Sequence, residues 1–154
     1  MLVERPLTLV SWGIKHVTPN CGDEWLAKIE ELVSHFKPDA LVFENCVGSR
    51  RSVRVQQLLA RLADLSERWG LRMRDFSRLD LKFTFASCGA TTKDQIAHAL
   101  ARWFPEIAPH VPRKRRPWMK EDRWMTIFTA LSLAVTLLHP PAKPKRAAST
   151  SSAP

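Results

Sequence analysis

The chain has 154 residues, of which 45% are hydrophobic and 25% charged, as is typical of one globular domain with a hydrophobic core. A net charge of +9 favours a polyanionic partner, although a generic basic protein has the same balance. No apolar run reaches the roughly 18 to 20 residues that cross a bilayer, and no secretory signal opens the chain. We therefore expect a cytoplasmic protein. The three cysteines and five histidines show no disulfide or zinc-ligand spacing.

The first half of the chain predicts alternating strands and helices. A β-type run at Leu7–Trp12 is followed by a turn-rich segment and a helical pattern that stops at Lys37-Pro38. Ala40–Phe43 then predicts a short buried strand that ends on Glu44. A second helix closes at Gly70 before the strand Leu71–Phe76. This order is typical of an α/β fold.

The second half predicts helices separated by a basic loop. Ser77 and Thr91 or Thr92 are the expected caps of two helices, the second of which ends at Pro105. Because Pro105–Pro117 contains four prolines and a run of basic residues, we expect it to form no regular element. A last helix is predicted from about Lys120 to Leu138. We expect one domain at residues 1–139 and a disordered basic tail at 140–154.

Glu44 is the first candidate site residue. It follows four apolar strand residues, which places it at the carboxyl end of a strand, where open α/β sheets bind their ligands. Arg50, Arg51 and Arg54 follow at once and could hold a phosphate backbone beside a carboxylate-bound cation. The alternative is a strand-end glutamate that simply reaches water.

Three motifs, in order, resemble the RuvC Holliday-junction resolvase family. They are the strand segment Pro38–Glu44, the helix start Thr91–His98 and the last-helix segment Thr129–Thr136. The resemblance covers about residues 7 to 139. It implies an RNase-H-like mixed sheet flanked by helices and a Mg²⁺- or Mn²⁺-dependent endonuclease that acts on branched DNA. It also implies a homodimer, since such an enzyme cuts two symmetric strands.

The chemistry of such enzymes requires several converging carboxylates. Two divalent cations about 3.5 to 4 Å apart activate the attacking water and stabilise the leaving oxygen, and both prefer carboxylate ligands. The resemblance draws these acids from the first strand, the end of the middle strand and the last helix. It assigns the middle position to Glu44, and Lys93 would approach the scissile phosphate. On spacing alone Lys93 is a solvated residue of a first helical turn.

The chain departs from the family pattern at its first strand. Leu7–Trp12 resembles the family's second strand, and only Met1–Val3 could be a remnant of the first, with no aspartate in it. Because that strand is central in an RNase-H-like sheet, its loss would remove paired ladders and expose two edges. We expect that the start codon is assigned too far downstream; the alternative is a degraded or cut gene.

A second departure is Thr129, which stands where the family motif has the carboxylate of the last helix. Glu121 and Asp122 are acids near the start of that helix and are the remaining candidate metal ligands. Asp122 lies seven residues before Thr129, about 10.5 Å along a helix axis, so it cannot occupy the same point. The alternative is that both acids only stabilise the positive end of the helix dipole.

A basic loop is the third candidate feature. Arg113, Lys114, Arg115 and Arg116 lie near Trp118 and Trp124, which combines charge with stacking surface as a DNA-contacting loop would. A merely solvated loop is the alternative.

Three hypotheses follow from these patterns. The first is a metal-dependent endonuclease acting on branched DNA, with Glu44 and Asp122 as catalytic acids and Glu121 as a further ligand. The second is a non-catalytic nucleic-acid-binding module, whose DNA binding would be salt-sensitive, indifferent to metal and unaffected by Glu44→Ala. The third is a scaffold domain that binds no DNA.

Overall fold

The computed structural model describes residues 1–4, 7–14, 22–45, 53–113 and 122–139, and it has a mixed α/β fold. Its strands are β1 (Leu2–Glu4), β2 (Thr8–Ser11), β3 (Ala40–Glu44) and β4 (Arg72–Phe76). Its helices are α1 (Gly22–Phe36), α2 (Val53–Arg68), α3 (Arg78–Ala86), α4 (Lys93–Trp103), the 3-10 helix η1 (Pro105–His110) and α5 (Met125–Leu138).

The described strands form two separate sheets of two strands each. β1 and β2 form an antiparallel pair, whereas β3 and β4 run parallel, with Ala40 opposite Arg72 and Glu44 opposite Phe76. The predicted remnant Met1–Val3 thus overlaps a strand that pairs with β2. Because β3 and β4 are parallel, their carboxyl ends meet at one edge of their sheet, which we call the carboxyl edge.

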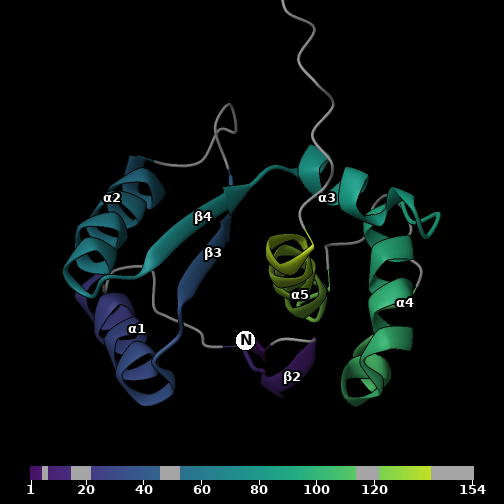
Figure 1. Cartoon of the computed structure of the whole chain (residues 1–154), viewed down its shortest axis with the longest axis horizontal. Helices are drawn as coiled ribbons and strands as arrows, with labels where there is room; N and C mark the ends of the chain where they lie inside the picture. The colour runs from purple at the N-terminus through teal and green to yellow at the C-terminus, as the bar shows by residue number, and fades with distance from the viewer. Residues whose placement is uncertain (5–6, 15–21, 46–52, 114–121, 140–154) are drawn as a thin grey trace, which may run out of the picture.

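Helices cover the β3–β4 sheet in layers. α5 contacts both β3 and β4 and also packs against α3 and α4, while α2 contacts β4. Figure 1 shows α1 and α2 on one side of the β3–β4 sheet and α5 on the other, with α4 beyond α5. The helix–strand–helix–strand order that the sequence predicted for the first half is therefore confirmed.

The main hydrophobic core is built around α5. Phe85, Leu100, Ile107, Phe128 and Leu131 are all at most 1% exposed and come from α3, α4, η1 and α5. The β1–β2 pair also packs against this cluster through partly buried apolar residues. Among the described residues, no helix combines the length and the apolar character needed to cross a membrane.

Helix ends follow local sequence signals. Gly70 adopts a φ of 65°, and the Leu71 N–H donates to the Ser66 carbonyl at 2.9 Å, which closes α2 as predicted. Ser77 and Thr92 each form a capping box at the start of α3 and α4. These caps fix where α3 and α4 begin, and both helices lie close to the sites discussed below.

Two expectations about the second half are wrong. Residues Pro105–His110 form the 3-10 helix η1 rather than loop, because proline is tolerated in a first helical turn and short-range backbone bonds suffice there. The last helix begins at Met125 rather than Lys120, because Asp122 closes a turn just before it, accepting from the Met125 N–H at 3.0 Å. The predicted tail at 140–154 lies outside the described residues.

Candidate functional site at the carboxyl edge

Glu44 ends β3, as predicted, and its carboxylate binds an arginine. Arg78 donates from Nε to Oε1 of Glu44 at 3.0 Å. Arg78 is the first residue of α3, and the parallel register brings the end of β4 and the start of α3 beside the end of β3. The Glu44 side chain is 18% exposed, whereas that of Arg78 is 71% exposed. The guanidinium therefore lies against one oxygen of a carboxylate that is itself only partly exposed.

A second polar pair lies at the same edge. The Asn45 side-chain amide donates to Oδ2 of Asp75, and the Asn45 backbone N–H donates to the Phe76 carbonyl at 2.8 Å. Asp75 lies opposite Phe43 in the register, so it shares a face with Phe43, and Glu44 points to the other face. The two carboxylates of this edge thus lie on opposite faces of the sheet and do not converge on one point.

The remaining predicted ligands bond to the backbone near α5. Asp122 Oδ1 accepts from the Trp124 N–H at 2.9 Å, and the Thr129 hydroxyl donates to the Met125 carbonyl at 3.0 Å. Glu121 lies outside the described residues. In the described part of the chain, no three His, Cys, Asp or Glu side chains form a group that could hold a metal ion. Within the described residues, Asp122 and Thr129 thus bond to backbone groups and do not join a carboxylate cluster of the kind that a two-metal site needs.

Three of the predicted phosphate contacts lie within the described residues. Lys93 is the exposed first residue of α4, directly after the capping box of Thr92 and Gln95. Arg113 is exposed just after η1. Arg54 falls in the first turn of α2. The remaining basic residues of the prediction lie outside the described residues: Arg50, Arg51, Lys114, Arg115 and Arg116.

Trp124 is packed within the protein on one side. Its ring lies 4.2 Å from that of His110, which in turn meets Trp12 at 5.0 Å. The Arg123 guanidinium lies 5.0 Å from the Trp124 ring centroid. Trp124 is therefore half-buried in an aromatic cluster that joins β2 to the turn before α5, so one face of its ring is already used.

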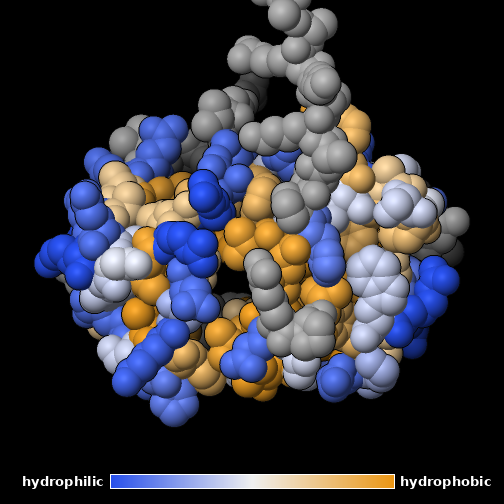
Figure 2. All heavy atoms as spheres, in the orientation of Figure 1, coloured by the Kyte–Doolittle hydropathy of each residue, from blue (hydrophilic) through white to orange (hydrophobic). Residues whose placement is uncertain are grey.

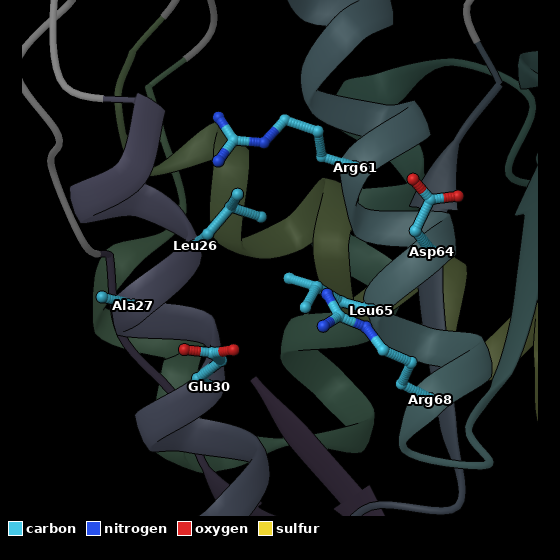
Figure 3. Close-up of a pocket in the computed structure, with 7 residues that line it drawn as sticks. All are labelled: Leu26, Ala27, Glu30, Arg61, Asp64, Leu65 and Arg68. Atoms are coloured by element: carbon cyan, nitrogen blue, oxygen red, sulfur yellow. The ribbon is translucent and has the colours of Figure 1, made fainter.

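A groove between two helices lies apart from these residues. It has a volume of about 320 Å³ and is lined by residues of α1 and α2, none of which the sequence predicted as a site. Figure 3 shows Leu26 and Leu65 in the space between the helices, with Arg61 reaching from α2 toward α1. Because Glu30, Asp64 and Arg68 balance Arg61 in charge, the groove favours no particular ionic ligand.

Sequence reasoning missed Asp75 and Arg78. One signal could have found them: the strand Leu71–Phe76 follows a helix after the first buried strand, so a parallel pairing brings its last residues beside Glu44. A comparison with models of known protein families gives no match for this chain, and a comparison with curated proteins finds no similar sequence.

Proposed function

We propose that this protein binds branched DNA through the carboxyl edge of β3 and β4, as a resolvase-type protein on an RNase-H-like scaffold. The observation that carries the proposal is the position of Glu44, a polar carboxylate at the end of an apolar strand, joined to basic Arg78. Open α/β sheets bind ligands at this edge. The DNA partner makes a cytoplasmic location part of the same proposal.

The different chemistry of the two parallel strands supports the RNase-H-like part of the proposal. β4 carries Arg72, Arg74 and Asp75, as edge strands do, whereas β3 is apolar until Glu44. An apolar run of this kind is typical of an interior strand with a neighbour on each side. Among the described strands β3 is paired only with β4, so the proposal adds a neighbouring strand on its other side.

The molecular surface between the β3–β4 sheet and α5 agrees with this interpretation. Figure 2 shows a hollow bordered by apolar residues in the middle of one face, between the β3–β4 sheet and α5 in this view. The residues Ala40–Phe43 are all apolar and yet only partly buried. A further strand paired with β3 on the side away from β4 would bury these residues more fully and would pair with the β3 backbone.

The specific activity that we propose is metal-dependent endonuclease cleavage, with Mg²⁺ or Mn²⁺ and with Glu44 as one ligand. A carboxylate at a strand end is a hard ligand that such cations prefer. Lys93 and the arginines near Glu44 would contact phosphates. A complete site needs further acids, so this activity depends on a ligand beyond Glu44 and Asp122.

A second candidate function is non-catalytic DNA binding, and one observation favours it. The Glu44 carboxylate is bound by Arg78, while Asp122 is bound by the backbone before α5. Both predicted acids thus have partners within the chain that need no cation. A chain with such a site could hold a DNA junction without cutting it.

Labelled four-way DNA junctions test both candidates in one experiment. If the protein is an endonuclease, it should cleave the junction in Mg²⁺ or Mn²⁺, and Glu44→Gln should abolish cleavage. The matched control is Glu67→Gln, which changes an exposed glutamate of α2 and should leave cleavage intact. The non-catalytic module predicts junction binding without cleavage, which Glu44→Gln leaves intact. Absence of junction binding by the unmodified chain at about 0.1 M salt would count against both.

A further inference from the structure

Helix α3 carries apolar side chains on two opposite faces. Leu81 and Phe85 are buried against the core, as expected for residues four apart on one face of a helix. Leu79 and Phe83 repeat the same spacing two positions away, about 200° around the axis, and are 59% and 50% exposed. Leu79 and Phe83 are the two most exposed large apolar side chains among the described residues, and both lie on this one face of α3.

The outer face of α3 is also basic. Arg78 and Lys82 are both exposed and directly precede Leu79 and Phe83 in the helix, with Arg78 paired to Glu44. The one acid of the helix, Asp80, is occupied in the cap, where its carboxylate accepts from the Ser77 backbone N–H at 2.7 Å. The outer face therefore offers apolar contact and positive charge together.

The same face continues from the carboxyl edge. Arg78 belongs to the first turn of α3 and binds Glu44 at 3.0 Å. The start of α3 therefore lies directly beside the carboxyl edge, and an extended ligand bound there could also contact α3. A strand of nucleic acid carries both features that this face matches, phosphates for the basic side chains and bases with an open ring face. Two apolar side chains alone are far smaller than the roughly 800 Å² per partner of a stable protein interface.

We infer that the outer face of α3 is a base-stacking surface, on which the Phe83 ring stacks with an unpaired base while Leu79 packs beside it. The ligand is DNA that carries unpaired bases, as at a branch point. This inference rests on the proposed DNA-binding function and adds to it a residue that selects unpaired over fully paired DNA. Arg78 and Lys82 supply charge beside the stacked base.

The test compares binding of two DNA probes by the full chain, measured by fluorescence anisotropy. One probe is a duplex with a central unpaired loop that contains 2-aminopurine, and the other is the same duplex fully paired. Phe83→Ala should weaken binding of the looped probe by roughly 5- to 150-fold, the range of one lost base–aromatic stack, and leave the paired probe unchanged. Phe83→Trp keeps an aromatic ring at this position. It should keep the affinity for the looped probe and the quenching of 2-aminopurine fluorescence that stacking on the ring causes.

Leu79→Ala is the matched control, because it removes an exposed apolar side chain of the same face without removing a ring. It should cost less than Phe83→Ala on the looped probe. Equal binding of the looped probe by the unmodified chain and Phe83→Ala overturns the inference and leaves the proposed function standing. If the unmodified chain binds neither probe, both the inference and the proposed DNA-binding function are contradicted. Binding of phosphatidylglycerol vesicles that depends on Phe83, with no effect on DNA, would assign the face to lipid and also overturn the inference.

Discussion

Arg78 and Glu44 join the first turn of α3 to the last residue of β3, with 3.0 Å between the guanidinium Nε and the carboxylate Oε1. Parallel pairing of β3 with β4 makes this contact possible, because it places the start of α3 beside the end of β3. The pair gives the carboxyl edge both signs of charge. The affinity of this edge for an anionic ligand should therefore depend on Arg78 as well as on Glu44.

The Arg78–Glu44 pair should contribute little to stability. Arg78 is largely exposed, so water and salt screen the attraction. We expect a double-mutant cycle of Arg78→Met and Glu44→Gln to give a coupling of about 0.2 to 1 kcal/mol in urea unfolding, decreasing as salt is raised. A coupling of several kcal/mol that salt does not change would contradict this description of the edge.

The amides of β3 should alternate in hydrogen-exchange protection. The Asn45 N–H donates to the Phe76 carbonyl, and the Arg72 N–H donates to the Asp39 carbonyl. The backbone N–H and C=O groups of the odd-numbered residues of β3 therefore point toward β4. In a parallel ladder the N–H group of Val42 then points away from β4. We expect the Val42 amide to exchange faster than those of Leu41 and Phe43. Equal protection of these three amides would mean that a further strand pairs with β3 on the side away from β4.

Phe128 should be among the most costly core residues to truncate. Its side chain is 1% exposed and lies on α5 within the main core. Phe128→Ala should lower the free energy of unfolding by about 3 to 5 kcal/mol, because it removes buried area and leaves a cavity. Leu79→Ala, on the exposed face of α3, should change it by at most about 0.5 kcal/mol. Similar losses for the two variants would show that the core is not centred on α5.

The cap of α4 should contribute measurably to stability. The Thr92 hydroxyl accepts from the Gln95 N–H at 3.3 Å, and the Gln95 side chain accepts from the Thr92 N–H at 3.0 Å. Thr92→Ala should cost about 0.5 to 2 kcal/mol in thermal or urea unfolding. Thr92→Ser keeps the hydroxyl and should keep most of that free energy; an equal loss in both variants would exclude the cap as the cause.

Local patterns in the sequence predicted much of this fold. Helical spacing, Gly70 and the Thr92 cap each depend on residues within a few positions of one another, and the structure confirms them. Glu44 was identifiable because a polar residue ends an apolar run. These features need no knowledge of which distant segments meet.

The features that the sequence did not reveal depend on distant contacts. The Arg78–Glu44 pair spans 34 positions and requires the parallel register of two strands. The start of α5 depends on whether Asp122 caps a turn or enters the helix, a choice that weak local preferences do not decide. Pro105–His110 was predicted as a loop because prolines dominate it, yet short-range bonds form a 3-10 helix there.

Binding of a four-way DNA junction over a salt series is the measurement that tests the central claim most directly. Fluorescence anisotropy with the unmodified chain should show binding at about 0.1 M salt, and the affinity should fall at least roughly tenfold between about 50 and 200 mM, as the release of about two counterions requires. Arg78→Met should reduce the affinity, since it removes charge from the carboxyl edge. No binding at low salt, or binding that neither salt nor Arg78→Met changes, would contradict a DNA-binding role for this edge.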